Sequence, residues 1–428
     1  MDAFLSFFSF ADPNIRYVVI GCVLLAAGSA VVGCFTLLRR RSLSGDAVAH
    51  SVLPGVCVAF MLTGTKNSVV MLIGAFIAGW LSLILTDYIP RKSRIKEDTA
   101  IGVVLSVFFG LGILLLTTIQ QSGAASQSGL DKFLFGKAAS LVGGDLPIFA
   151  GLALVLILSV ILFFKEFTLL SFDPGFAKSA GLPVRALELL LTTLTVLAVV
   201  EGIQATGVVL MAAMLITPAA AARYWTDRIG LMVILAALFG AFSGVAGAYI
   251  SYVAPAMPTG PWIVMALSVL AFISFMFAPG RGVIWILILQ RRNRHKIQEE
   301  NMLKALYHLG EGEHDFFIPR TVLEINNKRP FPSRAFHTTL QRLRRQDLLT
   351  ESGGAWAFTL KGKEQGQRMA KLHRLWEMYL TTILSIAPDH VHDDAETIEH
   401  IITPELERKL EELLEFPETD PHGEKIPY

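Results

Sequence analysis

Residues 15–41 read IRYVVIGCVLLAAGSAVVGCFTLLRRR, a largely apolar stretch closed by three arginines. A helix that crosses the hydrocarbon core of a membrane needs about 20 residues of this kind. Lysine and arginine collect in cytoplasmic loops. The stretch therefore predicts a membrane-spanning helix whose end at Arg39 faces the cytoplasm. The N-terminus before it has no basic region and no small-residue cleavage site, so we expect this first span to be retained.

The composition of the whole chain also indicates a membrane protein. Of its 428 residues, 53% are hydrophobic and 17% are charged, whereas a soluble domain carries nearer a quarter charged residues. Charges are sparse up to Leu289, and from Gln290 onward the chain has the composition of an ordinary soluble domain. Three cysteines, Cys22, Cys34 and Cys57, lie in apolar runs without metal-ligand spacing, so we interpret them as core residues.

Further apolar runs follow, and their basic flanks orient them. Nine spans, with the N-terminus outside and the C-terminus inside, satisfy every loop, and eight or ten spans are the alternatives. The stretch between Phe172 and Arg223 has to cross twice, with a turn near Glu201. The predicted spans are 15–38, 46–62, 68–89, 99–119, 146–164, 187–200, 206–222, 229–253 and 262–277.

A carboxylate and an imidazole stand four residues apart in the second predicted span, within SLSGDAVAHSVLPG at 42–55. This spacing places Asp46 and His50 on one face of a helix. Ionisable groups inside spans are costly and mark a substrate path, and this pair of donors suits Mn, Fe or Zn. In the alternative interpretation, Asp46 caps the helix and His50 bonds to a neighbouring helix. Pro54 and Gly55 are expected to bend or break the span.

The string LRRRSLSGDAVAHSVLPG at 38–55 resembles the signature of permeases in the ABC importer family for manganese, zinc and iron. The stretches FDPGFAKSAGLP at 172–183 and QATGVVLM at 204–211 are similar to the coupling segment and a later helical signature of that family. This resemblance covers residues 10–285 and implies an all-α, type II importer fold with Asp46 and His50 as the metal site of the pathway. It also implies three partners: a separate ATPase subunit, an extracytoplasmic metal-binding protein, and a second permease subunit that is a copy or a sister chain. The coupling residues that it implies are Asp173, Pro174, Ala177 and Gly181.

The chain contains no GxxxxGK[ST] phosphate-binding loop, so ATP hydrolysis is expected from another subunit and this chain is not expected to be an enzyme. Glu201 has two interpretations. It is a group beside the transport path or, as we favour, a solvated carboxylate at an extracellular turn.

Residues 297–360 have the pattern of a helix-turn-helix followed by a β-wing. Helices are predicted at 297–309, 319–326 and 333–347, the last with a capped start, and two strands at 348–351 and 355–360 flank a glycine turn. In such modules the third helix reads the major groove of DNA, although a basic helix face is more often simply solvated. The DNA-binding candidates are Ser333, Arg334, His337, Thr338 and Arg342.

The final part of the chain carries histidine and glutamate at helical spacing. His373 precedes Glu377 by four residues, and a second set follows within 392–400. Such spacing puts the side chains on one stripe, and N and O donors without thiolate favour Mn or Fe, with Zn able to compete. The alternative is a surface helix rich in these residues. The candidate regulatory ligands are His373, Glu377, His392, Glu396, Glu399 and His400.

The segments LKGK at 360–363, HRLWE at 373–377 and VHDDAETIEH at 391–400 resemble the iron- and manganese-dependent repressors of the diphtheria-toxin-repressor type. The resemblance covers residues 297–428 and implies a winged helix, a dimerisation region and the six candidate ligands as a regulatory metal site. It favours manganese, because iron sensors have cysteine and manganese sensors have glutamate at the position of Glu396. One departure concerns the first helix, where manganese members have Asp and Glu and this chain has Asn301 and Lys304. Glu299 or Glu300 is a candidate substitute, but a lysine near a cation site weakens affinity, so the regulatory site is expected to be incomplete or retuned.

These patterns together predict a permease domain at 1–290, a basic juxtamembrane linker at 291–296, a winged helix-turn-helix at 297–365 and a metal-binding and dimerisation region at 366–428. The predicted function is import of a divalent metal, manganese before zinc or iron, by spans that contact lipid in the inner (plasma) membrane. The tail is expected in the cytoplasm as a metal sensor that binds operator DNA, is released by proteolysis near 291–296, or gates import. The competing functions are a membrane-anchored transcription regulator and a proton-coupled metal carrier.

Overall fold

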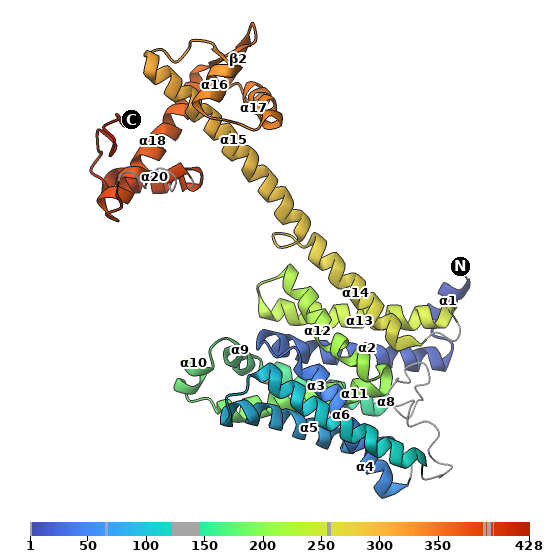
Figure 1. Ribbon diagram of the computed structural model, residues 1–428. Helices are drawn as coiled ribbons and strands as arrows, with labels where there is room; N and C mark the ends of the chain where they lie inside the picture. The colour runs from blue at the N-terminus through green and yellow to red at the C-terminus, as the bar shows by residue number, and fades with distance from the viewer. Residues whose placement is uncertain are drawn as a thin grey trace. The chain divides into compact units, whose positions relative to one another are not determined.

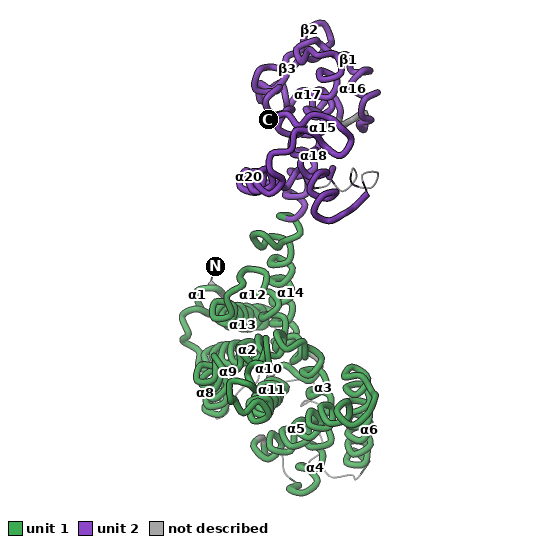
Figure 2. The backbone as a smooth tube through the Cα atoms, turned by 90° about the vertical axis from the view of Figure 1, so that its left-hand side faces the viewer, with its two compact units in different colours: residues 1–285 green, residues 286–428 purple. Residues whose placement is uncertain are grey.

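The computed structural model describes residues 2–64, 67–121, 146–254, 258–387, 391, 395–396 and 398–428. Figure 1 shows how its helices and strands are arranged. The chain divides into two compact units, Met1–Trp285 and Ile286–Tyr428, which Figure 2 draws in different colours. We refer to them as unit 1 and unit 2.

Unit 1 is built from helices, and its described residues contain no strand. In lipid each backbone N–H and C=O has to be satisfied within the protein, and a helix does this inside one segment. The helices of unit 1 are α1 (Asp2–Phe8), α2 (Pro13–Leu38), α3 (Ser44–Ser51), α4 (Leu53–Thr63), α5 (Ser68–Lys92), α6 (Glu97–Gln121), α8 (Leu146–Leu162), α9 (Phe164–Phe172), α10 (Pro174–Ser179), α11 (Val184–Thr206), α12 (Val208–Trp225), α13 (Ile229–Val253) and α14 (Thr259–Phe277).

The described residues contain seven helices that are long and apolar enough to cross a membrane. The pair α8 and α9, bent by 69°, would make eight if it forms one span, so the predicted nine spans are not confirmed. The second span is one helical stretch, Leu43–Thr63. Its expected break is slight, because Val52, at the junction of α3 and α4, keeps helical angles of φ −76° and ψ −21°.

The predicted turn near Glu201 is wrong. α11 continues to Thr206 and is interrupted at Gly207, whose φ of 88° lies in the left-handed region that glycine adopts freely. Glu201 is 1% exposed, and its two carboxylate oxygens have no hydrogen-bond partner among the described residues. Burying an unpaired carboxylate in an apolar interior costs much more free energy than leaving it in water, so the sequence interpretation placed Glu201 in water. The structure buries it instead.

The helices of unit 1 approach one another most closely at glycine. A Cβ atom added to Gly33 of α2 would lie 1.7 Å from the carbonyl oxygen of Leu215 on α12. One added to Gly55 of α4 would lie 2.0 Å from the carbonyl oxygen of Gly74 on α5. Helices in lipid associate through such close packing of small residues, because lipid is as apolar as their side chains. A larger residue at Gly33 or Gly55 would therefore separate α2 from α12 or α4 from α5.

Unit 2 combines a helix-turn-helix, a small sheet and a helical C-terminal region. The basic segment 291–296 lies inside the long helix that enters this unit and is itself helical. The predicted core residues of the third helix, Phe336, Leu340 and Leu343, are at most 3% exposed. The elements are α15 (Val283–Glu313), β1 (Arg320–Thr321), α16 (Val322–Lys328), α17 (Ser333–Arg345), β2 (Leu349–Ser352), β3 (Ala355–Phe358), α18 (Leu360–Thr382), the 3-10 helix η4 (Glu399–Ile401) and α20 (Pro404–Leu413).

The predicted two-stranded wing is confirmed and gains a third strand. The sheet order is β1-β3-β2 with antiparallel pairs, and β2 and β3 are joined through Gly353 and Gly354. Both glycines have positive φ, 60° and 81°, as the tight turn of a hairpin requires. The capped start predicted for α17 is wrong, because its N-cap is Pro332, which makes no side-chain capping bond. A capping box formed by Thr321 and Glu324 instead begins α16.

Replacing Gly33 by alanine should destabilise unit 1. The new methyl group would collide with the backbone of α12, and overpacking of this kind costs about 1–3 kcal/mol. The thermal unfolding midpoint of the purified full chain in detergent measures the effect. Gly110→Ala in α6 is the matched control, since a Cβ atom there meets no other atom within 4 Å. Equal midpoints for the two variants would contradict the proposed close contact.

Candidate transport site and C-terminal ion cluster

Asp46 and His50 lie on the part-exposed side of α3. The Nε2 atom of His50 is 3.5 Å from Oδ1 of Asp46, and the two side chains are 26% and 46% exposed, respectively. The His50 ring meets Phe109 of α6 edge to face, with 5.5 Å between ring centroids. Asp46 is not the N-cap of α3, which is Leu43. The buried side of α3, packed among α5, α6, α11 and α12, consists of Ser44, Gly45, Ala47, Val48, Ala49 and Ser51.

This pair supplies two ligand side chains. Divalent zinc and the harder divalent cations usually take four to eight ligands. No group of three or more His, Cys, Asp or Glu side chains that could hold a metal ion occurs in the described part of the chain. A cation held by Asp46 and His50 therefore needs donors other than the His, Cys, Asp and Glu side chains that the structure describes.

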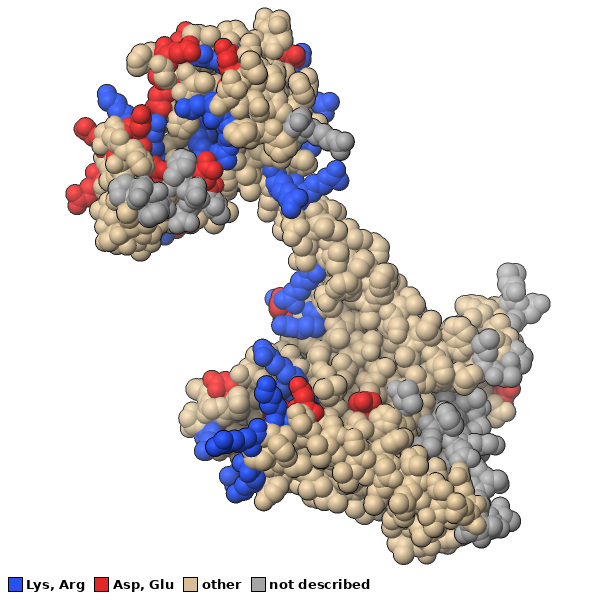
Figure 3. Space-filling view, in the orientation of Figure 1, with Lys and Arg blue, Asp and Glu red and all other residues tan. Residues whose placement is uncertain are grey.

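Ion pairs join three helices at one end of unit 1, where Figure 3 shows its lysines and arginines gathered. Arg39, after α2, lies 2.7 Å from one carboxylate oxygen of Glu188 on α11, and Arg91 of α5 lies 3.3 Å from the other. Arg41 pairs with Asp87 of α5 at 2.9 Å. Basic residues mark the cytoplasmic side of spans, so this end agrees with the predicted orientation.

The predicted coupling residues build the short helix α10. Asp173 is its N-cap, and Oδ1 accepts a hydrogen bond of 2.8 Å from the backbone N–H of Phe176. Pro174 occupies the first turn, Ala177 is fully buried, and Gly181 after the helix has a φ of 83°. Phe176 is 58% exposed on the surface of α10. Asp173, Pro174, Ala177 and Gly181 therefore shape the segment, and Phe176 is one of its exposed side chains.

The DNA-binding candidates on α17 differ in their exposure. His337 and Thr338 are exposed. Arg342 is half-buried, and its Nη2 atom lies 3.3 Å from Nε2 of His295 on α15. The side chains of Ser333 and Arg334 lie outside the described part of the structure. The DNA-reading role of this helix stays a prediction.

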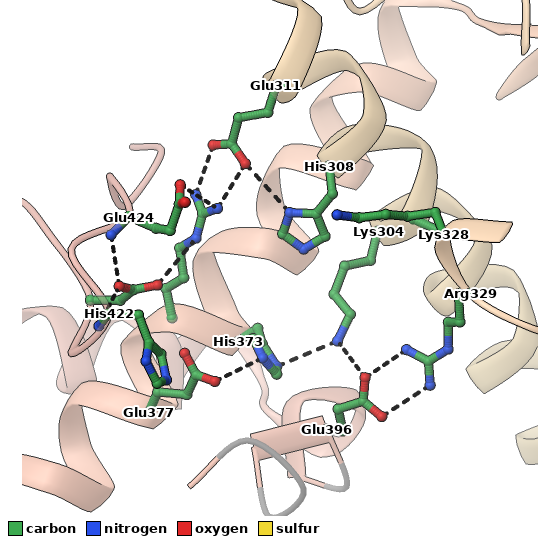
Figure 4. A pocket seen from close by; sticks show the side chains of 14 residues that line it. Lys304, His308, Glu311, Lys328, Arg329, His373, Glu377, Glu396, His422 and Glu424 are labelled. Atoms are coloured by element: carbon green, nitrogen blue, oxygen red, sulfur yellow. Dashed lines mark hydrogen bonds and ion pairs between the residues drawn. The ribbon is translucent and has the colours of Figure 1, made fainter. Parts of the chain in front are cut away.

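Lys304 of α15 lies in the middle of the predicted regulatory metal site (Figure 4). Its Nζ atom is 2.7 and 3.0 Å from the two carboxylate oxygens of Glu399, 3.6 Å from Glu396 and 3.4 Å from Nδ1 of His373. Lys304 is 4% exposed and the Glu399 side chain is fully buried. The other ring nitrogen of His373 lies 3.1 Å from Glu377. Side chains predicted to surround a metal ion thus surround an ammonium group.

Two further predicted ligands have partners that the sequence did not reveal. Arg329 donates to both oxygens of Glu396, at 2.8 and 3.1 Å, as Figure 4 shows. Nδ1 of His400 lies 2.7 Å from Glu300. His392, the remaining predicted ligand, lies outside the described residues. The sequence offers Glu300 as a substitute ligand, but it does not indicate either pairing, because Arg329 precedes Glu396 by 67 residues and Glu300 precedes His400 by 100.

The protonation of the cluster follows from its contacts. Burial alone would raise the pKa of Glu399, but hydrogen bonds from His373 and Lys304 and their charges hold that pKa below its ordinary value. Burial alone would lower the pKa of His373, but its bonds to Glu377 and Glu399 raise it overall. With Lys304 in this position, the described side chains do not fit a resident divalent cation.

Comparison with known proteins identifies both units. Residues 11–278 match the ABC 3 transport family. The chain belongs to this family. Residues 359–428 match the iron dependent repressor, metal binding and dimerisation domain. The predicted family of unit 1 and the repressor-like character of unit 2 are confirmed, and the ABC 3 permease is an integral membrane protein.

Individual relatives of this ABC 3 permease extend over most of its length. It is 47% identical over 376 residues to the manganese transport system membrane protein MntC of Bacillus subtilis, covering 88% of this chain and 86% of the relative. It is 44% identical over 291 residues to the zinc transport system membrane protein TroC of Treponema pallidum, covering 68% and 97%. The solved structure of PsaBC from Streptococcus pneumoniae in complex with Fab is 35% identical, with a TM-score of 0.58 and coverage of 65% and 97%. This likeness confirms the type II importer-like fold.

Replacing Asp173 by alanine should loosen α10. The substitution removes the capping bond to the N–H of Phe176, which typically stabilises a helix by about 0.5–2 kcal/mol. Backbone hydrogen exchange across residues 174–182 of the full chain should therefore accelerate. Asp173→Asn is the control, because asparagine caps helices as well as aspartate does. Equal acceleration in both variants would show that charge rather than capping matters here.

Proposed function

We propose that this ABC 3 permease is the membrane-spanning subunit of an ATP-driven importer of a divalent transition metal, manganese before zinc or iron. The observation that carries the proposal is the Asp46–His50 pair, a carboxylate and an imidazole 3.5 Å apart within a membrane-spanning helix. Ionisable groups at such positions are costly and serve transport. Mn, Fe and Zn all accept this combination of donors. The names of the relatives MntC and TroC, which refer to manganese and zinc, support the same class of cargo.

A second permease subunit would complete this site. Two Asp46–His50 pairs, one from each subunit, would offer four side-chain donors, enough for a tetrahedral site. The partial exposure of both side chains supports this arrangement, because a site completed within one chain would bury them. Ligands shared between two subunits could also separate when the subunits move, which would release the cargo.

Two further partners are proposed, an ATPase subunit and an extracytoplasmic metal-binding protein. The chain has no phosphate-binding loop, so a separate ATPase subunit is proposed to dock on α10, where Phe176 is exposed. An extracytoplasmic metal-binding protein is proposed to deliver the cation from the opposite side. A proton-coupled carrier would need neither partner, and α10 would then have no function.

Unit 2 is proposed to be a cytoplasmic regulatory module of the repressor type. Its helix α17 follows a turn and precedes a wing, which is the arrangement that places a helix in the major groove of operator DNA. A chain that served only to anchor such a regulator would need neither the Asp46–His50 pair nor α10. We therefore propose regulation as an addition to transport.

Asp46→Ala and His50→Ala should each strongly reduce ATP-dependent metal uptake. Loss of an outer-shell partner alone typically lowers metal affinity about 10–100-fold, so loss of a ligand should lower uptake at least about tenfold. The measurement is uptake of Mn²⁺, Fe²⁺ and Zn²⁺ into vesicles that contain the permease, its ATPase and the metal-binding protein.

Asp98→Asn is the matched control for this experiment, since Asp98 is an exposed carboxylate in the first turn of α6, as Asp46 is in the first turn of α3. Uptake by the control should equal that of the unmodified chain. Unchanged flux and selectivity in both alanine variants would rule out the proposed site. Uptake that persists without the ATPase would instead support the proton-coupled carrier.

A further inference from the structure

The ion cluster around Lys304 has the position and the ligand types of a metal site but already contains a cation. One ammonium group is within 3.6 Å of Glu396, Glu399 and His373, which come from segments distant in the sequence. Lys304 belongs to α15, His373 to α18 and Glu399 to η4. The ammonium therefore links the first helix of the helix-turn-helix to the helical C-terminal region.

Two carboxylates of the cluster already pair with cations of the chain. Lys304 and Arg329 face the carboxylates of Glu396 and Glu399, each at hydrogen-bonding or ion-pair distance. Buried charges are stable only when each has a partner. The neighbouring Asn301, one helical turn before Lys304, contributes no charge, and its Oδ1 atom has no hydrogen-bond partner among the described residues.

A divalent ion could not share this site with Lys304. Metal ions bind carboxylate oxygens at about 2.0–2.6 Å, and both oxygens of Glu399 already accept hydrogen bonds from the ammonium. A metal ion at those oxygens would also lie a few ångströms from a like charge. Entry of a metal therefore requires Lys304 to leave, and the adjoining cavity of about 520 Å³ is the space into which it would move.

We propose that Lys304 is a tethered cation that takes the place of the regulatory metal in unit 2. The ammonium holds α15 against α18 and η4 at all times, as a bound metal ion would do only when the metal is abundant. The assembled form of unit 2 is then independent of cytosolic manganese, and the His and Glu side chains around Lys304 do not sense it. This inference goes beyond the proposed transport function and does not depend on Asp46 or His50.

Hydrogen exchange of the full chain, with and without saturating MnCl₂, tests the proposal in peptides that cover α18 and η4. For the unmodified chain we expect the same exchange in both conditions. Lys304→Glu restores a carboxylate and should create a manganese site. Some amides exchange only when the site opens. At a Mn²⁺ concentration of about 100 times Kd, exchange of these amides should slow about a hundredfold.

The control is Lys409→Glu, which changes the net charge equally at an exposed lysine of α20 paired only locally with Glu405. This variant should show no manganese-dependent protection. Manganese-dependent protection of α18 and η4 in the unmodified chain would overturn the proposal, because it would mean that the metal displaces Lys304. A folded Lys304→Glu variant without such protection would overturn it as well.

Lys304→Met provides a second test, which does not depend on folding of the glutamate variant. It removes the charge and retains the length of the side chain, so the carboxylate of Glu399 loses its cation. We expect exchange in η4 to accelerate at least about tenfold, as the loss of one partner of a buried ion pair implies. Exchange equal to that of the unmodified chain would show that Lys304 does not hold the two parts of unit 2 together. The readout is local to unit 2, so failure of the transport proposal leaves it unaffected.

Discussion

A charge that is removed from water needs a compensating partner, and the functional parts of both units are organised by this constraint. In unit 1, Arg39 and Arg91 share the carboxylate of Glu188, which joins α5 and α11 to the end of α2. In unit 2, Lys304 and Glu399 compensate each other in a nearly water-free interior. The proposed transport pair Asp46–His50 differs from these ion pairs in being part-exposed, with side chains 46% and 26% exposed.

The position of that pair depends on how closely the helices pack. α3 is short, and the residues on its buried side are mostly small, so the surrounding helices can approach it closely. Glycines at the contacts of α2 with α12 and of α4 with α5 permit distances that any side chain would prevent. α3 itself packs among α5, α6, α11 and α12, so Asp46 and His50 are carried by a helix with close neighbours on its buried side.

The donor side chains of the two units differ in how many internal partners they have. In unit 1, the proposed transport ligands Asp46 and His50 lie 3.5 Å apart and are both part-exposed. In unit 2 the corresponding donors already have partners within the chain. Lys304 pairs with Glu399, Arg329 with Glu396 and Glu300 with His400. If these internal charges replace the metal, the C-terminal unit keeps the architecture of a metal-dependent repressor while its assembly no longer reports on metal. Regulation of transport would then require another signal at this unit.

The sequence by itself determined the features that depend on local spacing and composition. Apolar run lengths predicted most of the long apolar helices of unit 1, and four-residue spacing placed Asp46 beside His50. The glycine pair of the wing and the substitution of Lys304 at a ligand position were also visible in the sequence. Each of these rests on neighbours within one or two helical turns, whose geometry is nearly the same in every protein.

Only the tertiary structure decided which distant side chains meet. The burial of Glu201, the interruption of the helix at Gly207 and the third strand β1 depend on packing against other elements, and the sequence interpretation missed them. The pairs Arg329–Glu396 and Glu300–His400 join residues far apart in the chain, so no periodicity indicates them. Spacing along one helix reveals what kinds of donors share a face. Whether those donors receive a metal ion or an ammonium group depends on which other helix lies opposite, and that is set by the fold.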